Sequence, residues 1–340
     1  MGPGGRVLLA HGSGGRLMHE LVQDLFLRYL GNSLLAAGDD AAVWSVPGLG
    51  AGRLAVTTDS YVVSPIFFPG GDIGKLAVCG TVNDLAMVGA EPLALTAGFI
   101  LEEGLSLSDL ERVVVSMAEA AREAGVAVAA GDTKVVDRGK ADQIFINTAG
   151  VGWVRDGTHL SGAHARPGDV VLVSGTVGEH GLAVLSMREG LEFSFPLASD
   201  CAALNGLVAE MLSCGGVLRC LRDPTRGGLA TTLNEIALQS GVGIELEEAA
   251  VPVSEGVRAA CELLGLDPLY AACEGRLVAV ASPESEGVLL ETLRRNRLGR
   301  QAARIGRVTA NPAGRVVLLT AYGGRRILDM LSGAQLPRIC

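Results

Sequence analysis

The first half of the chain has aspartates at several points. A turn or a helix cap explains each of them alone but does not explain all of them together. Asp39 and Asp40 precede an apolar run, Asp59 and Asp132 end strand-like stretches, and Asp84 lies inside a helical pattern. Strand ends converge at one edge of a sheet, where α/β folds bind ligands. Carboxylates gathered there repel one another unless cations intervene, and oxygen ligands suit Mg²⁺. The pattern predicts a Mg²⁺ site of Asp40, Asp59, Asp84 and Asp132 that serves a nucleotide triphosphate.

Asp84 carries the strongest signal, because it interrupts an apolar helical stripe. Steps of four, three, four and four residues connect Ile73, Ala77, Gly80, Asp84 and Val88. These positions share one helix face. The glycine one turn before Asp84 permits close approach of another element. The interpretation as a satisfied core polar group stays open for Asp84 taken alone.

Glycine-rich turns could hold the phosphates through their backbone N–H groups. The first such turn consists of Gly12, Ser13, Gly14 and Gly15. Its alternative reading is a plain strand–helix connection. Residues 71–75 lack the spacing of a P-loop, so an ATP site here is of another type. Residues 222–229 form a second glycine loop before a helix, with Asp223 as a further acid.

One cysteine differs from the others by position. The chain has seven cysteines without any CxxC spacing, and six of them lie in or beside apolar segments as small hydrophobes. The seventh, Cys340, is the last residue and follows Pro337-Arg-Ile. Its alternative reading is an incidental residue on a frayed end. The histidines show no ligand spacing and receive no predicted role; they are His11, His19, His159, His164 and His180.

Length and composition limit the class of protein. A chain of 340 residues with 49% hydrophobic residues suits two domains with substantial cores. A net charge of −9 without a basic stripe argues against nucleic acid as a partner. No apolar stretch is long enough to predict a membrane span, and no secretion signal is recognisable. The sequence therefore predicts a cytoplasmic protein.

Alternating strands and helices must position these residues. In the first half, strands are predicted at 6–10, 54–63, 92–100, 126–136 and 143–154, with helices at 17–30, 73–89 and after Ser106 or Ser108. In the second half, strands are predicted at 169–174, 243–247, 276–281 and 315–320, with helices at 181–189, 199–213, 226–240 and 285–295. A short helix is expected within 323–340. The order indicates an α+β protein with domains at 1–157 and 158–325, followed by a flexible tail at 326–340.

The motifs together resemble one family, the HypE hydrogenase-maturation proteins of the aminoimidazole-ribonucleotide synthetase (PurM-like) superfamily. The resemblance covers nearly the whole chain, and its last segment, Pro337-Arg-Ile-Cys340, is the most specific. The shared segments are residues 10–15, 38–42, 57–60, 67–77, 82–86, 131–134, 223–228 and 337–340. The resemblance implies a PurM-like homodimer with ATP and Mg²⁺ beside the dimer interface. The ATP-binding residues would be Gly12, Ser13, Gly14, Gly15, Asp39, Asp59, Asn83, Asp84, Gly131, Asp132 and Asp223.

The resemblance further implies a reaction on Cys340. A HypF-type carbamoyltransferase would load carbamoyl onto this thiol, and a HypC–HypD complex would accept the cyanide for the iron of NiFe hydrogenase. Lys134 and Glu274 would lie near the reacting end of the tail. Around Glu274 the chain reads Cys-Glu-Gly-Arg276, where Asn before and Lys after the Glu-Gly pair are expected.

The chemistry is consistent with these residues. Dehydrating a thiocarboxamide removes oxygen, and phosphorylation turns that oxygen into a good leaving group. Glu274 is the predicted base for the N–H proton, and Lys134 is predicted to stabilise developing charge. Two alternatives remain at this stage. One is a selenophosphate synthetase or thiamine-phosphate kinase of the same superfamily, and the other is a non-catalytic carrier that presents Cys340.

Overall fold

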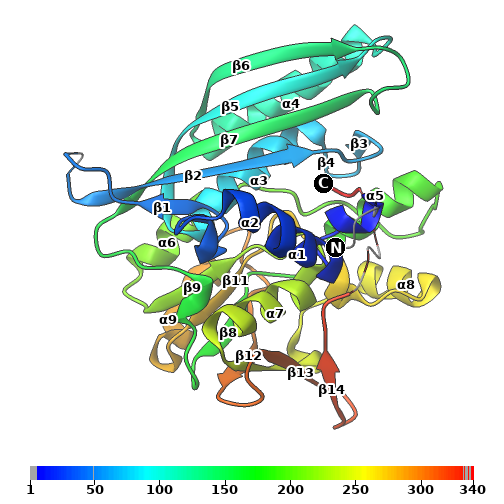
Figure 1. The fold of residues 1–340 in the computed structure, drawn as a ribbon. Coiled ribbons are helices and arrows are strands. Elements are labelled where there is room, and N and C mark those ends of the chain that lie inside the picture. The colour runs from blue at the N-terminus through cyan, green and yellow to red at the C-terminus, as the bar shows by residue number, and fades with distance from the viewer. Residues whose placement is uncertain (1–5, 49, 332, 334–335, 337) are drawn as a thin grey trace.

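The computed structural model describes residues 6–340 except 49, 332, 334, 335 and 337. Its first half is a five-stranded sheet of order β1-β2-β7-β5-β6, drawn at the top of Figure 1. All pairs are antiparallel except β5 and β6. A small hairpin of β3 and β4 lies beside this sheet. The bounds are Ala42–Trp44 (β1), Gly52–Tyr61 (β2), Phe67–Phe68 (β3), Gly71–Asp72 (β4), Ala90–Glu102 (β5), Ala127–Val136 (β6) and Ile144–Arg155 (β7).

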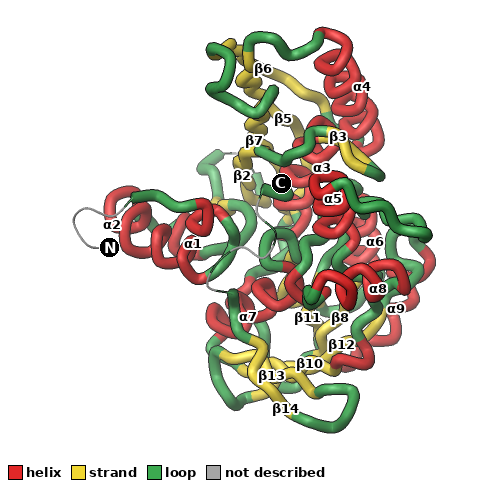
Figure 2. The backbone as a smooth tube through the Cα atoms, turned by 90° about the vertical axis from the view of Figure 1, so that its right-hand side faces the viewer, coloured by secondary structure: helices red, strands yellow, loops and turns green. Residues whose placement is uncertain are grey.

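Two helices cover one face of this sheet, as the rotated view shows (Figure 2). Helix α3 (Ile73–Met87) begins after Asp72, whose side chain accepts hydrogen bonds from two backbone N–H groups of the first turn. Helix α4 (Leu107–Ala124) is capped by Ser106. Nearly every residue of α3 is buried, because the helix lies between this sheet and the second half of the chain. A polar side chain on α3 is therefore held rigidly between the two halves.

The second half is built on a seven-stranded sheet of order β14-β13-β10-β12-β8-β11-β9. Its helices pack around that sheet over two separate clusters of buried apolar residues. The strands are Val170–Val173 (β8), Leu218–Arg222 (β9), Gly243–Glu247 (β10), Val278–Ala281 (β11), Ala303–Thr309 (β12), Arg315–Leu319 (β13) and Arg325–Leu328 (β14). The helices are Glu179–Glu189 (α5), Asn205–Ser213 (α6), Gly228–Ser240 (α7), Glu255–Leu264 (α8) and Glu286–Arg295 (α9).

The first helices and the last residues of the described part of the chain lie beside the junction of the two halves. Helices α1 (Arg16–Leu21) and α2 (Leu27–Leu30) are joined by a π-helical turn, Val22–Phe26, and project from the body in Figure 2. The C-terminus lies between the two sheets (Figure 1). There the Val62 N–H, just beyond β2, donates to the Cys340 carbonyl over 3.1 Å.

Most predicted elements are present, and the α+β class is confirmed. Two expectations are wrong: residues 6–10 form no strand, and the described part of 323–340 contains strand β14 instead of a helix. Strands β9 and β12 and helix α8 were not predicted, and α6 begins at Asn205 rather than at 199. Pro337 of the terminal motif lies outside the described residues. None of the described helices is both long and apolar enough to cross a membrane.

Candidate active site

A cavity of about 670 Å³ lies between the two halves. One part of its wall is apolar and comes from the α1–α2 region and α7. The other part is acidic and comes from the ends of β2 and β9, from α3 and α7, and from the segments before β1 and β11. Most of the apolar wall is formed by Met18, Val22, Leu27, Leu35, Ala36, Ala37 and Leu238. The acidic wall includes Asp39, Asp40, Asp59, Asp84, Asp223, Glu235 and Glu274.

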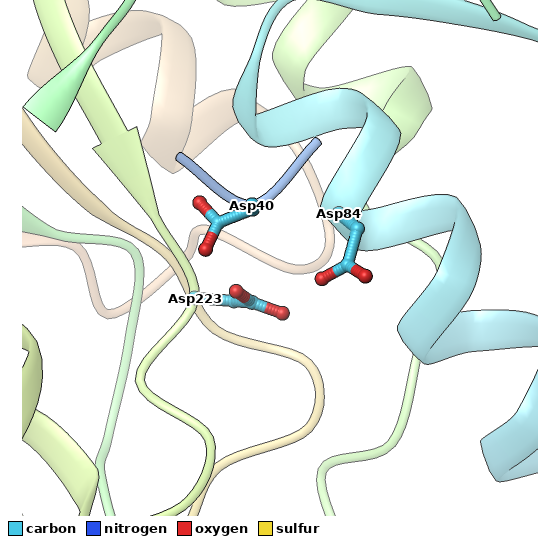
Figure 3. Close-up of side chains that lie close together, drawn as sticks. All are labelled: Asp40, Asp84 and Asp223. Atoms are coloured by element: carbon cyan, nitrogen blue, oxygen red, sulfur yellow. The ribbon is translucent and has the colours of Figure 1, made fainter. Parts of the chain in front are cut away.

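Three carboxylates of the acidic wall converge from separate segments, as Figure 3 shows. Asp40, Asp84 and Asp223 each offer an oxygen within 4.8 Å of the others. Asp84 comes from α3, Asp40 precedes β1, and Asp223 follows β9. The Thr57 hydroxyl holds Asp84 by donating to Oδ2 over 2.8 Å. Three oxygens at this spacing match the donor set of a divalent cation.

Three ionised carboxylates this close together are unfavourable without a cation, and the raised pKa values of the cluster show this. Burial, followed by the charge of Asp223, raises the pKa of Asp84 well above its usual value. Burial also raises the pKa of Asp223 to about 8. For Asp40 burial outweighs the ion pair with Arg222 at 2.7 Å, and its pKa rises to about 6. Bound cations would replace these protons.

The raised pKa of Asp223 has a consequence for stability. Its carboxyl holds a proton in the folded state up to about pH 8, but in the unfolded state only up to its ordinary 3.8. Between these values the folded state binds more protons, so stability falls as pH rises. Without Mg²⁺ and nucleotide, Asp223→Asn should therefore gain roughly 1 kcal/mol or more relative to the parent from about pH 5 to about pH 9.

Calorimetric unfolding of both proteins across that range measures this gain. The exposed Asp137→Asn is the matched control, and its difference from the parent should stay constant. A pH-independent difference for Asp223→Asn would show that the Asp223 carboxyl is not held protonated.

Two predicted binding residues hold neighbouring segments in place. The buried Asn83 donates from Nδ2 to the carbonyls of Ala202 and Glu274, and its Oδ1 accepts from the Leu204 N–H. It does not line the cavity, so its role here is to position the segment that carries Glu274. Asp39 lines the cavity and also accepts from the Gly162 N–H over 2.8 Å.

The first glycine turn lies beside the cavity, but only part of it faces inward. Gly14 lines the cavity at φ +76°, and a Cβ there would lie 2.7 Å from the Arg226 backbone oxygen. Ser13 and Gly15 line a smaller neighbouring hollow, and a Cβ on Gly15 would lie 2.3 Å from the Leu331 oxygen. Gly12 lines neither cavity. Close packing thus explains the glycines at 14 and 15.

The third predicted segment lies elsewhere in the single chain. Gly131, Asp132 and Lys134 lie on β6, the edge strand, and none of them lines the cavity. Asp132 pairs with Lys134 at 2.6 Å, and about 70% of each side chain is exposed. The Lys134 hydrogen bond lowers the pKa of Asp132. Within one chain, Asp223 therefore takes the place in the cluster that the sequence predicted for Asp132.

Two of the three predicted reacting groups, Cys340 and Glu274, meet at the cavity, and the third, Lys134, does not. Cys340 and Glu274 both line it, and the Glu274 Oε1 is buried without a hydrogen-bond partner among the described residues. Burial, then Asp223, raises the pKa of Glu274 well above its usual value. Burial likewise raises the pKa of the Cys340 thiol to about 12, although Arg226 opposes this effect. In this state both groups keep their protons.

Two arginines of the second glycine loop were not assigned roles from the sequence. Arg226 lines the cavity, and its pKa is raised chiefly by Cys340 and further by Asp59 and Glu274. Arg222 is buried and donates to Asp40 and to the Gly38 carbonyl over 2.7 and 2.6 Å. The sequence could have indicated both arginines, because they lie on the same loop as Asp223 and a buried guanidinium group needs a carboxylate partner.

Comparison with known proteins agrees with this arrangement. The models of the AIR synthase related protein N-terminal and C-terminal domains match residues 38–154 and 166–319. The chain is 58% identical to carbamoyl dehydratase HypE of Azotobacter vinelandii, covering 99% of this chain and 98% of that protein. It is 48% identical to carbamoyl dehydratase HypE of Escherichia coli, covering 98% and 99%.

Solved structures are equally similar. HypE in complex with ATP superposes with a TM-score of 0.82 at 54% identity, over 98% of this chain and 100% of that one. The HypE of a HypE–HypF complex superposes with a TM-score of 0.86 at 48% identity, over 92% and 99%. AaThiL complexed with AMPPCP and TMP, at 22% identity and a TM-score of 0.70, shares the fold. The chain belongs to the AIR synthase related proteins and, within them, to the HypE family of hydrogenase-maturation carbamoyl dehydratases.

Proposed function

We propose that this chain uses ATP to dehydrate a carbamoyl group on the sulfur of its own Cys340, forming a thiocyanate. The cyano group would supply the CN ligands of the NiFe-hydrogenase iron centre. The observation that carries this proposal is the position of the terminal thiol. Cys340 lines the same cavity as the acid cluster, next to Glu274 and Arg226.

The cavity suits a nucleotide bound with Mg²⁺. The apolar wall of α1–α2 and Leu238 is suited to a base, and the acid cluster to a triphosphate with its cations. Asp40, Asp84 and Asp223 would hold the metal, with Asp59 beside them. Mg²⁺ there would neutralise phosphate charge. Burial is the first cause of the raised pKa of Glu274, and cations would remove the second cause by neutralising the neighbouring carboxylates.

The residues around the tail would then perform two steps. The carbamoyl oxygen attacks the terminal phosphorus of ATP, ADP leaves, and Arg226 stabilises the developing negative charge. One of the two N–H protons passes to water as the phosphorylated oxygen turns the carbamoyl group into an imidate. Glu274, ionised after the cations bind, takes the second N–H proton while the C–O bond breaks and phosphate leaves. The nitrogen lone pair forms the triple bond of the S–C≡N product.

Loading of carbamoyl would take place outside the cavity. A thiol with a pKa of about 12 is a poor nucleophile at neutral pH. We infer that the end of the tail, residues 338–340, leaves the cavity to receive carbamoyl from a HypF-type carbamoyltransferase and later delivers cyanide to a HypC–HypD complex, whereas Arg325–Leu328 stays in the sheet as β14. The HypE–HypF structure of a relative supports the first of these partners.

A homodimer would complete the site. Strand β6 is exposed along almost its whole length, and Val128 and Val135 are 43% and 67% exposed. A long unpaired edge with apolar side chains is a surface that proteins normally cover. The uncovered face of the first sheet lies on the side opposite α3 and α4 (Figure 2). A second copy packed there would bring its Lys134 and Asp132 toward the cavity of the first copy.

Hybrid dimers test whether Lys134 acts across the interface. We expect Lys134→Ala and Glu274→Gln homodimers to bind ATP and accept carbamoyl but to form little thiocyanate. A dimer with one chain of each kind keeps Glu274 of one copy and Lys134 of the other, so one of its two sites is intact. An equal mixture should recover roughly a quarter of the parental rate after subunit exchange. Thiocyanate detected by mass spectrometry provides the measurement.

Other outcomes of this experiment are equally informative. If Lys134 acts within its own chain, the mixture stays as inactive as its components. If both single variants dehydrate at close to the parental rate, neither residue serves the chemistry. A mixture of Glu274→Gln and Cys340→Ala proteins is the negative control, because none of its dimers has an intact site, and it should stay inactive.

The remaining alternatives make different predictions for ATP turnover. A selenophosphate synthetase or thiamine-phosphate kinase has no use for a terminal cysteine and would turn ATP over equally with unmodified protein. A non-catalytic carrier would turn over none. We expect ATP consumption only when Cys340 is carbamoylated. We further place the domain boundaries after residues 157 and 325 and the protein in the cytoplasm.

A further inference from the structure

The end of the chain is bound through its main chain by a buried histidine of α5. The Ile339 carbonyl lies 2.6 Å from His180 Nε2. Because a carbonyl only accepts, Nε2 carries the proton, and Nδ1 accepts from the Ser199 hydroxyl over 2.8 Å. The Cys201 N–H donates to the same Ser199 oxygen, and the Phe68 ring contacts the imidazole edge-on. The ring orientation and tautomer of His180 are thereby fixed.

A second contact comes from Arg188, two helical turns further along α5. Its Nη2 donates to the Arg338 carbonyl over 2.6 Å, and its Nε donates to the Ser64 carbonyl over 2.8 Å. The segment beyond β2 completes the arrangement. The Ser64 N–H donates to the Arg338 carbonyl and the Val62 N–H to the Cys340 carbonyl, over 3.3 and 3.1 Å. Arg188 therefore ties the tail to the first half of the chain.

We propose that His180 and Arg188 form a clamp that recognises the main chain of residues 338–340 and sets how often Cys340 lies beside Glu274. They are positioning residues, since neither lines the cavity. The contacts go to carbonyl oxygens and none goes to the thiol. The clamp can therefore hold the tail whether its sulfur carries hydrogen, carbamoyl or cyanide. The catalytic role of the clamp rests on the proposed function, whereas the docking of the tail does not depend on that function.

Alkylation of Cys340 by iodoacetamide measures the docking without ATP or a partner. Mass spectrometry of the C-terminal peptide follows this one thiol in the full-length protein. Losing one such buried hydrogen bond should release the tail more often, and we expect His180→Ala and Arg188→Ala each to accelerate alkylation about tenfold. The amide of His180→Gln can still donate to Ile339 and accept from Ser199, so this variant should stay within about threefold of the parent.

Controls make the result decisive. Arg295→Ala removes an exposed arginine of α9 paired with Glu291 and should leave the rate unchanged. If His180→Ala fails to fold, Arg188→Ala, at a half-buried position, carries the test alone. A parental alkylation rate in folded Arg188→Ala protein overturns the clamp, and so does equal acceleration by His180→Gln and His180→Ala. If carbamoylated parental protein forms no thiocyanate with ATP while the alkylation pattern is as expected, the proposed function is wrong and the clamp stands.

Discussion

Cys340→Ala is expected to abolish thiocyanate formation completely while leaving the fold and Mg·ATP binding unchanged. The substitution removes the only atom to which the carbamoyl group is attached, so a decrease of at least about a thousandfold is expected. The clamp contacts involve carbonyl groups that alanine retains, so the shortened side chain should still dock. The measurement is the mass of the C-terminal peptide after incubation with ATP and the carbamoyl-loading partner.

Cys214→Ala is the matched control. This cysteine is half-buried at the end of α6 and donates only to the Met211 carbonyl, so its loss should leave the yield of thiocyanate unchanged. Detection of a stable carbamoyl or cyano adduct on the Cys340→Ala protein would overturn the mechanism. ATP turnover by this variant at the parental rate would favour a superfamily enzyme with a separate substrate.

Asp84→Asn is expected to lower the affinity for Mg·ATP by about a hundredfold or more, because it would remove one of the three carboxylates that we propose as metal ligands. The same change should raise the stability of the protein without ligands. Burial and repulsion from Asp223 disfavour the Asp84 carboxylate, and an amide carries neither cost. The Asn side-chain oxygen can still accept from Thr57. Opposite signs for binding and stability distinguish a binding residue from a structural one.

Calorimetric titration and thermal unfolding measure the two effects. Asp109→Asn, in the first turn of α4, alters an exposed carboxylate paired with Arg112 and should leave nucleotide affinity unchanged. Near-parental Mg·ATP affinity in a folded Asp84→Asn protein would remove Asp84 from the site. Proton release on binding, detected by comparing buffers, should also be smaller in this variant.

Local sequence patterns were sufficient for much of this protein. The helical spacing from Ile73 to Val88 predicted α3 and placed Asp84 on a face with Gly80, and both residues line the cavity. A cap at Ser106 or Ser108 predicted the beginning of α4, and the structure has the cap at Ser106. These features depend on contacts between near neighbours in the chain, which periodicity and capping report directly.

Other features depended on contacts between distant segments. Residues 6–10 have strand composition, but no strand pairs with them, and an isolated strand is not stable. The sequence placed Asp132 at a strand end, as it did Asp59, yet Asp132 lies within β6 at the edge of the sheet, so its carboxylate lies outside the cavity of its own chain. The order of the strands in the sheet, which the sequence does not reveal, decided that Asp59 lines the cavity and Asp132 does not.

The sequence by itself determined the α+β class, the family and a terminal cysteine with an acidic, nucleotide-type set of residues. Only the tertiary structure showed that Asp223 joins Asp40 and Asp84, that Arg226 faces Cys340, and that His180 holds the tail. The reason is physical. A carboxylate cluster or a main-chain clamp is defined by atoms a few ångströms apart in space, and its members here come from segments more than a hundred residues apart in the chain.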